Sequence, residues 1–285
     1  MLAGVFLFSC NDALGKWLLG TYGLGQMLLI RSAAALALLA APILRSGLRP
    51  FLAAPRPGLQ LFRIVLSTAE VAMFFIAVSY LPLADTVAFY LAGPIYVAAL
   101  SGLLLREPVG LAGWIAVLLG FAGVLLALRP SAATLSGPAL VALAGSFSFA
   151  VLMLVTRHLR GTTDIVLVTG QVAGTLLYGL VIAPFDWVHP SAQDLGAMAL
   201  LGVVATVALF CVTRSLKLAP ASVVVPYQYS LIVWAMLLGY AVFGDTPQAH
   251  VVAGSVAIVA AGLFLFWHEQ RGGGVPPPGQ DRAVT

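Results

Sequence analysis

Charged residues are scarce in this chain. Of its 285 residues only 8% are Asp, Glu, Lys or Arg, whereas 61% are hydrophobic, and the mean hydropathy is +1.04. A soluble domain carries about a quarter charged residues, so this chain has too few charges to cover a globular surface with polar groups. The scarcity argues against a soluble domain and indicates that lipid surrounds most of the chain.

Cysteine and the residue patterns of catalysis are also scarce. Cys10 and Cys211 lie in apolar runs at a spacing that suggests no disulfide framework. The histidines lie in connectors or at the ends of apolar runs, without a carboxylate or cysteine at metal-binding spacing. We find no protease motif such as HExxH or a GxSxG-like site, no ATP-binding loop and no filter-like Gly-rich loop. We therefore expect neither an enzyme nor a channel, and no cofactor, metal or nucleic-acid partner.

The chain instead contains a series of apolar runs. The length of each run is close to the roughly 20 residues that a membrane helix needs. They predict an all-α polytopic membrane protein with ten transmembrane helices. Short connectors carry most of the Gly, Pro and charged residues. The predicted spans are Leu2–Leu19, Leu24–Leu44, Leu59–Tyr80, Ala84–Leu105, Leu111–Leu128, Gly137–Val155, Ile165–Pro184, Leu195–Ser215, Ser222–Phe243 and Val251–His268.

Lysine and arginine are distributed unevenly about these spans. With the N-terminus in the cytoplasm, only Lys16 and Arg129 lie toward the outside, and Arg31 lies within a span. The positive-inside rule then predicts a multi-pass protein of the inner (plasma) membrane with both termini cytoplasmic. The residues on or beside the cytoplasmic face are Arg45, Arg49, Arg56, Arg63, Arg106, Arg157, Arg160, Arg214, Lys217, Arg271 and Arg282. Of these, we expect Arg45, Arg49 and Arg56 to bind anionic lipid head groups.

An internal repeat divides the chain into two halves. The segment YLPLADTVAFYLAGPIYVAALSGLLLRE at 80–107 has a weaker counterpart, LKLAPASVVVPYQYSLIVWAMLLGYAVFGD, at 216–245. Five helices per repeat is an odd number, so the repeats must have opposite orientations around a central cavity. We predict five-helix repeats at 1–129 and 137–268, followed by a disordered cytoplasmic tail at 269–285, which is rich in Gly and Pro.

These segments resemble the drug/metabolite transporter superfamily, in particular its EamA-type members. The resemblance is carried by LPLADT…GPIYVAALSGLLLREP…GWIAVLLGFAGV at Leu81–Val124 and, less closely, by Leu218–Asp245. The wider pattern is also similar to the YddG-type amino-acid exporters. The resemblance implies export by alternating access without ATP. It also implies that helices one, three, four, six, eight and nine line the cavity, while helices five and ten pack outside it.

Charged residues inside the spans are costly, by about 2.5–3.5 kcal/mol each on insertion scales. Asp12, Arg31 and Glu70 all fall near mid-membrane, and Lys16 follows Asp12 by one helical turn. One hypothesis is that Glu70 or Asp12 meets the ammonium of a zwitterion or titrates during transport. The alternative is that Asp12, Lys16, Arg31 and Glu70 form a buried charge network that stabilises helix packing.

Uncharged polar and aromatic residues complete the predicted site. Aromatic rings with polar tips suit amphipathic organic solutes, because they offer apolar area together with a hydrogen bond. We predict a secondary transporter of small organic metabolites, with amino acids as first choice and other metabolites, amines or drugs as alternatives. The predicted cavity residues, besides Asp12 and Glu70, are Asn11, Phe74, Tyr90, Tyr96, Ser146, Ser148, Tyr227, Gln228 and Tyr229.

Small residues at Gly170 and Gly174 form a GxxxG pattern that permits close helix packing. Packing within one subunit is the favoured interpretation, and a dimer contact is the alternative. We expect the protein to be a monomer or a weak homodimer in contact with membrane lipids and a small-molecule substrate.

Overall fold

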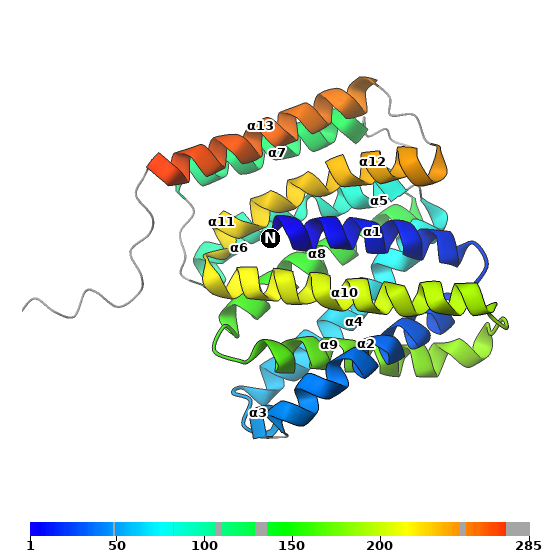
Figure 1. Ribbon diagram of the computed structural model, residues 1–285. Coiled ribbons are helices and arrows are strands. Elements are labelled where there is room, and N and C mark those ends of the chain that lie inside the picture. The colour runs from blue at the N-terminus through cyan, green and yellow to red at the C-terminus, as the bar shows by residue number, and fades with distance from the viewer. Residues whose placement is uncertain (48, 82, 106–109, 129–135, 245–248, 272–285) are drawn as a thin grey trace, which may run out of the picture.

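Helices make up most of the described structure. The computed structural model describes residues 1–47, 49–81, 83–105, 110–128, 136–244 and 249–271, and within these ranges the regular elements are all helical. Arg106, Arg129 and Arg282, and residues 272–285 of the predicted tail, lie outside the described residues. The helices form one bundle in which α1 (Leu2–Leu19) begins and α13 (Ala249–Arg271) ends at the same end (Figure 1).

The two halves of the chain contribute comparable sets of helices. After α1, the first half contains α2 (Leu24–Ser46), α3 (Arg49–Leu52), α4 (Pro57–Tyr80), α5 (Leu83–Tyr90), α6 (Gly93–Leu104) and α7 (Leu111–Leu128). The second half contains α8 (Gly137–His158), α9 (Asp164–Ile182), η2 (Ala183–Phe185), α10 (Ala192–Leu218), α11 (Ala221–Val224), η3 (Val225–Ser230), α12 (Leu231–Phe243) and α13.

Length and composition identify this as a multi-pass membrane protein. Among the described residues, five helical segments are long and apolar enough to cross a membrane: α2, α4, α8, Asp164–Phe185 and α10. Further apolar stretches lie in α7, α12 and α13. The observed bounds of α1 and α7 are those predicted, and α13 extends to Arg271, so residues 269–271 are helical rather than part of a disordered tail.

Two predicted spans are interrupted, and this corrects the sequence-based expectation of continuous helices. Ala84–Leu105 is broken into α5 and α6, and Ser222–Phe243 is divided into α11, η3 and α12. Each break lies beside a proline: Pro94 is the second residue of α6, and Pro226 lies in the first turn of η3. Proline has no backbone N–H to continue the hydrogen-bond ladder, so a helix breaks or tightens at that point.

The bundle is built from pairs of helices, one from each half. In these pairs α1 packs along α10, α4 along α8, and α2 along α9, while α7 and α13 pack on each other at one side of the bundle (Figure 1). Glycines permit the closest approaches. At Gly202 of α10 an added Cβ would overlap the backbone carbonyl of Arg31 on α2, and at Gly174 of α9 it would stand 2.6 Å from Ile64 Cγ2 on α4. The GxxxG pattern therefore packs within the subunit.

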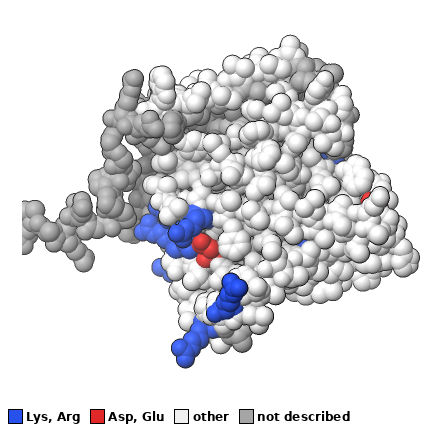
Figure 2. All heavy atoms as spheres, viewed as in Figure 1, with Lys and Arg blue, Asp and Glu red and all other residues white. Residues whose placement is uncertain are grey.

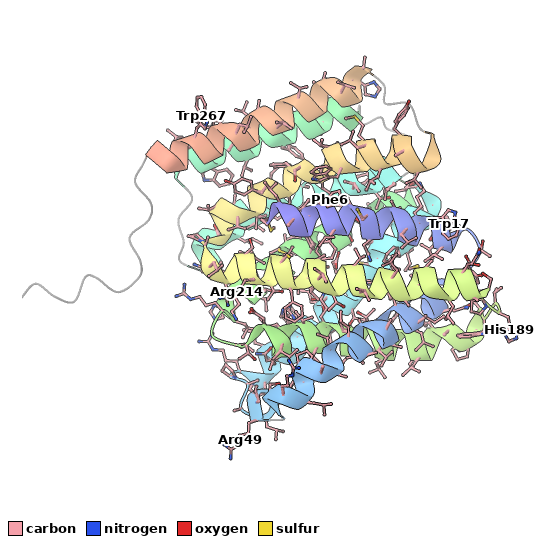
Figure 3. All side chains as sticks on the ribbon, viewed as in Figure 1. Phe6, Trp17, Arg49, His189, Arg214 and Trp267 are labelled. Carbon is pink, nitrogen blue, oxygen red and sulfur yellow. The ribbon has the colours of Figure 1, made fainter. Side chains whose placement is uncertain are left out.

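The two ends of the bundle differ in charge. Arg49 and Arg214 lie at one end, whereas Trp17 and His189 lie at the other (Figure 3). The lysine and arginine side chains visible on the face in Figure 2 gather at the first end. There Asp164 lies 2.5 Å from Lys217 Nζ and 3.6 Å from Arg214 Nη1. These contacts tie the start of α9 to the end of α10.

At the opposite end, polar side chains tie the α1–α2 corner to the start of α10. Gln26 donates to the carbonyl of Val188 at 2.6 Å and accepts from its N–H at 2.9 Å. The Tyr22 hydroxyl donates to Asp194 Oδ2 at 2.7 Å. The Asp194 carboxylate, by accepting this bond, raises the pKa of Tyr22. The Gln26 and Tyr22 contacts therefore join the first half to the second half at this end, whereas the Asp164 contacts at the other end lie within the second half.

Candidate functional site

A pocket lies between the two halves, in the middle of the bundle. It encloses about 1160 Å³ of space, including the part open to solvent, and residues of α1, α2, α4, α5, α8, α9, α10, η3 and α12 line it. No described residue of α7 or α13 is in the lining. The resemblance implied a cavity lined by the first, third, fourth, sixth, eighth and ninth predicted spans. The structure adds the second and seventh spans, which are α2 and α9.

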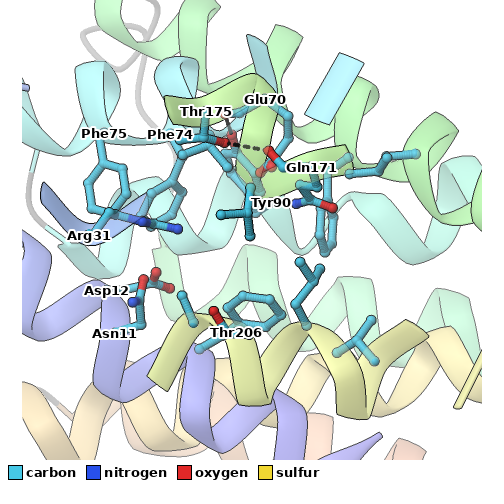
Figure 4. Close-up of a pocket in the computed structure, with 18 of the residues that line it drawn as sticks. Asn11, Asp12, Arg31, Glu70, Phe74, Phe75, Tyr90, Gln171, Thr175 and Thr206 are labelled. Atoms are coloured by element: carbon cyan, nitrogen blue, oxygen red, sulfur yellow. Dashed lines mark hydrogen bonds between the residues drawn. The ribbon is translucent and has the colours of Figure 1, made fainter. Parts of the chain in front are cut away.

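Charged side chains from three helices meet in this pocket. Asp12 comes from α1, Arg31 from α2 and Glu70 from α4. Figure 4 shows the Arg31 guanidinium pointing toward Asp12 with Phe75 beside it, and Arg31 Cζ lies 5.7 Å from the centre of that ring. Lys16, one turn beyond Asp12, is not a lining residue.

These charges gather without pairing. Within the described residues, none of Asp12, Arg31 and Glu70 forms an ion pair within 4.0 Å. Arg31 Nη1 is buried and has no hydrogen-bond partner there. A buried charged donor without a partner is costly. Arg31 therefore keeps a hydrogen-bond donor that no described residue uses.

The uncharged polar residues of the lining are mostly engaged in holding the wall together. Asn11 Nδ2 donates to the carbonyl of Leu201 on α10 at 2.9 Å, and Gln171 Oε1 accepts from Arg63 Nη2 at 3.3 Å. The hydroxyls of Thr175 and Thr206 donate to carbonyls one turn earlier in their own helices, at 3.0 and 2.7 Å. These residues shape the wall and leave recognition of charge to the three ionisable side chains.

Aromatic rings form the wall next to Glu70. The rings of Phe74 and Tyr90 make an edge contact with centroids 5.1 Å apart, and Tyr90 lies 5.9 Å from Phe149. The Tyr90 hydroxyl donates to the backbone carbonyl of Glu70 at 3.3 Å. The pocket therefore has an apolar aromatic wall beside its charged cluster, which suits a solute that is charged at one end and apolar at the other.

The structure places part of the predicted site in this pocket and part outside it. Tyr229 donates to the Val117 carbonyl at 3.1 Å, Tyr96 packs on Phe147 with centroids 5.5 Å apart, and Ser146 donates to the Leu143 carbonyl at 2.8 Å. The predicted residues that line the pocket are Asn11, Asp12, Glu70, Phe74, Tyr90 and Gln228. Those that do not are Tyr96, Ser146, Ser148, Tyr227 and Tyr229.

Some features of the site were not predicted. Arg63 was expected on or beside the cytoplasmic face; it lines the hollow beside α3, and its side chain is buried, with 2% of the residue exposed. Thr175 and Thr206 were not predicted as lining residues. Thr175 lies four residues after Gln171 on the same helix face, and that spacing is a usable signal. Thr206 has no such signal, because threonine is common in apolar helices.

Metal binding has no support in the described part of the chain. No group of three or more His, Cys, Asp or Glu side chains comes together there in a way that could hold a metal ion. Cys10 and Cys211 are both free. The pocket therefore offers charge and aromatic area for an organic ligand.

Comparison with known proteins gives a consistent family match. Residues 1–129 and 137–267 match the EamA-like transporter family. A riboflavin transporter of Vibrio cholerae is 25% identical, over 95% of this chain and 93% of its own length. An S-adenosylmethionine uptake transporter of Rickettsia prowazekii is 22% identical, over 76% and 74%. The pseudopaline exporter CntI of Pseudomonas aeruginosa is 28% identical, over 91% and 92%.

The fold also has a counterpart among solved structures. One crystal structure superposes with a TM-score of 0.78 over 94% of this chain and 96% of the other, at 19% sequence identity. This likeness concerns the fold alone.

Proposed function

The chain belongs to the EamA-like transporter family, and from that premise we propose that it is a ten-helix secondary transporter that exports small organic metabolites by alternating access. The two five-helix repeats would be residues 1–129 and 137–268, in opposite orientations. Amino acids, including aromatic and neutral ones, are the proposed substrates. Both termini would be cytoplasmic.

Reciprocal packing supports the inverted repeat. The first helix of the first half, α1, packs on the third long helix of the second half, α10, and the reverse pair, α4 and α8, packs in the same way. The pairs α2–α9 and α7–α13 join helices of equal rank in the two halves. Exchange of the two halves by a pseudo-two-fold axis in the membrane plane would produce this pattern.

The interrupted helices also support the proposal. The breaks beside Pro94 and Pro226 both interrupt the fourth span of their half, counting α5–α6 and α11–α12 each as one span. Tyr90 and Leu91 line the pocket beside the first break, and Gln228 lines it beside the second. Broken helices at matching positions near mid-membrane are typical of substrate sites in secondary transporters.

The unpaired charge cluster is the observation that carries the substrate proposal. The carboxylates of Asp12 and Glu70 would receive the ammonium of an amino acid, and the guanidinium of Arg31 would bind its carboxylate in the two-pronged geometry that arginine favours. The side chain of the substrate would then rest on Phe74, Tyr90 and Phe149. A zwitterion leaves the total charge of the pocket unchanged, which limits the electrostatic cost of moving it across the membrane.

The named relatives bear on the substrate in two ways. S-adenosylmethionine carries an amino-acid group, so a relative named for its uptake is compatible with zwitterion recognition. Riboflavin is a large aromatic solute without an amino-acid group, and a relative is named for its transport. An aromatic metabolite is therefore the second candidate, favoured by the aromatic wall of the pocket. The relatives include both an uptake transporter and an exporter, and the proposal of export rests on the family resemblance.

Counterflow in liposomes tests the proposal. Purified protein would be reconstituted into liposomes preloaded with one amino acid, and entry of labelled amino acids, riboflavin and S-adenosylmethionine would be measured with and without a pH gradient. We expect saturable, mutually competing amino-acid counterflow. Active protein that carries riboflavin but no amino acid would contradict the substrate proposal, and would leave the transporter assignment intact.

Substitutions in the cluster sharpen this test. We expect Arg31→Gln and Glu70→Gln each to weaken amino-acid counterflow about tenfold or more, because a hydrogen bond to a charged group contributes about 1.5–3 kcal/mol. Tyr240→Phe is the matched control, since Tyr240 is 59% exposed on α12 and does not line the pocket. Equal effects of all three substitutions would contradict the assigned roles.

Orientation can be tested separately. The beginning of α1, the end of α13 and the short helix α3 lie toward the same end of the bundle (Figure 1), which supports placement of both termini on the face of the Arg45–Pro57 connector. A tag after Thr285 and a single accessible cysteine in that connector should react with impermeant reagents from the same side of the membrane. Labelling from opposite sides would contradict the topology.

A further inference from the structure

A second hollow lies at the arginine-rich end of the bundle, away from the central pocket. Its walls are α3, the start of α4 and the first half of α9. We call it the α4–α9 groove. It is lined by Phe51, Leu52, Ala54, Pro57, Gln60, Leu61, Arg63, Ile64, Val166, Leu167, Thr169, Gly170 and Ala173. We propose that this groove binds one anionic phospholipid.

Helix packing accounts for the shape of the groove. At Gly174 the two helices are in tight contact, since an added Cβ would stand 2.5 Å from Thr68 Oγ1 and 2.6 Å from Ile64 Cγ2. At Gly170, one turn earlier on α9, the nearest atom of α4 would be 3.1 Å away, so the helices have begun to diverge. The lining residues of α9 precede this contact, and those of α4 lie toward α3. The groove is therefore a wedge that closes at Gly174.

Apolar side chains make the groove compatible with an acyl chain. Leu52 and Leu61 line it and are 84% and 62% exposed, so they face the surrounding lipid. Ile64 and Ala173 form the opposite walls further in. An acyl chain entering the wedge would cover these side chains at little cost, because it exchanges one hydrocarbon contact for another.

Two exposed arginines close in the chain to lining residues would give the groove a preference for negative charge. Arg49 begins α3, whose Phe51 and Leu52 line the groove, and Arg56 precedes the lining residue Pro57. Both side chains are exposed, and neither forms an ion pair with a described carboxylate. Arg56 makes a side-chain hydrogen bond with the ring of His158. A phosphate at the mouth would supply the missing counter-charge, in the geometry that arginine favours.

Polar atoms inside the groove match the region between head group and acyl chains. The hydroxyl of Thr169 is buried and has no hydrogen-bond partner within the described residues. A detergent tail or a free fatty chain offers nothing to this donor, whereas the ester carbonyl of a phospholipid accepts a hydrogen bond. Negative charge at the mouth, an ester at Thr169 and hydrocarbon in the wedge together specify a phospholipid, and the inference does not depend on the substrate of the central pocket.

Native mass spectrometry of the full chain in detergent tests the proposal with phosphatidylglycerol and phosphatidylcholine as probes. We expect one retained phosphatidylglycerol per protein and much weaker retention of phosphatidylcholine. The double variant Arg49→Gln/Arg56→Gln should bind phosphatidylglycerol about 25-fold more weakly, the product of about fivefold for each arginine near an anionic lipid. The control Arg160→Gln/Arg214→Gln removes the same charge from residues whose chain neighbours do not line the groove, and it should retain the lipid.

Two further variants locate the lipid within the groove. Ala173→Phe fills the wedge and should abolish retention, and Thr169→Val keeps the side-chain volume while removing the hydroxyl, so it should weaken retention without unfolding the protein. Three results would each overturn the proposal. The first is an equal loss of phosphatidylglycerol binding in the two double variants. The second is unchanged lipid binding by both Thr169→Val and a correctly folded Ala173→Phe, and the third is displacement of the lipid by inorganic phosphate alone.

Discussion

Arg63 on α4 donates a hydrogen bond to the side-chain oxygen of Gln171 on α9, with 3.3 Å between Nη2 and Oε1. The same guanidinium donates from Nε to Thr156 at 2.9 Å and from Nη1 to the Leu167 carbonyl at 2.8 Å. Gln171 lines the central pocket and Arg63 lines the α4–α9 groove. A single buried side chain of the first half therefore holds two helices of the second half together between the pocket and the charged end.

Replacement of Arg63 is expected to destabilise the protein. Arg63→Met keeps a long apolar side chain but leaves the oxygens of Thr156 and Gln171 without their charged donor. Hydrogen bonds to charged groups contribute about 1.5–3 kcal/mol each, so we expect a loss of about 2 kcal/mol or more in the free energy of unfolding. Thermal unfolding in detergent measures it, with Arg63→Lys as an intermediate comparison. A Met variant as stable as the parent chain would show that the buried guanidinium does not stabilise this junction.

Gly202 is predicted to set the position of Arg31. An added Cβ at Gly202 would overlap the Arg31 carbonyl, so Gly202→Ala should push α2 away from α10, lowering both thermal stability and transport. Gly196→Ala, in the same helix, is the control, because an added Cβ there meets nothing within 4 Å. It should be neutral, or stabilising by about 0.5–1 kcal/mol through the higher helix propensity of alanine. The prediction fails if the two variants behave alike.

Gln26 should contribute more to stability than Tyr22 at the opposite end of the bundle. Gln26 is fully buried and makes two hydrogen bonds to the backbone of Val188. Gln26→Leu would leave both backbone groups without partners, and we expect a loss of about 2 kcal/mol. Tyr22→Phe removes one hydrogen bond to Asp194, and we expect a loss of about 1 kcal/mol. Urea or thermal unfolding would rank the two variants, and the reverse order would contradict this account.

Glu70→Gln is expected to remove part of the pH dependence of transport. An ammonium is bound by the ionised carboxylate, so protonation of Glu70 as the pH falls should weaken binding in the parent chain. The glutamine variant cannot respond in this way. Asp12 remains titratable in that variant, Arg31 stays charged, and Asp12→Asn is the matched comparison. Counterflow measured across a range of pH checks the prediction, and an unchanged profile in Glu70→Gln would refute a titrating role.

Much of the architecture could be predicted because it depends on local properties of the chain. The bounds of α1 and α7 follow from where the apolar runs begin and end. The gathering of Asp12, Arg31 and Glu70 could be predicted from their similar depth in neighbouring spans, because buried charges in lipid must find polar surroundings. The absence of ion pairs among these three residues could not be predicted, because ion pairing depends on side-chain distances of a few ångströms.

Other parts of the site lay beyond sequence reasoning. In α8, α9 and α10 apolar residues occur on every face, so the helical period does not separate lipid-facing from pocket-facing positions. The spans that contain Tyr90, Tyr96 and Tyr229 are also apolar along most of their length, and only Tyr90 of these three lines the pocket. The burial of Arg63 could not be predicted, because a long side chain near a span end can either snorkel to the surface or turn inward.

The sequence by itself determined that this chain is a membrane protein and belongs to a transporter family, because hydropathy, charge bias and motif spacing are properties of consecutive residues. Only the tertiary structure decided where the helices break at Pro94 and Pro226, which polar groups are used in packing, and which charges remain available in the pocket. Those outcomes depend on contacts between helices that are far apart in the chain, and neither composition nor periodicity encodes such contacts directly.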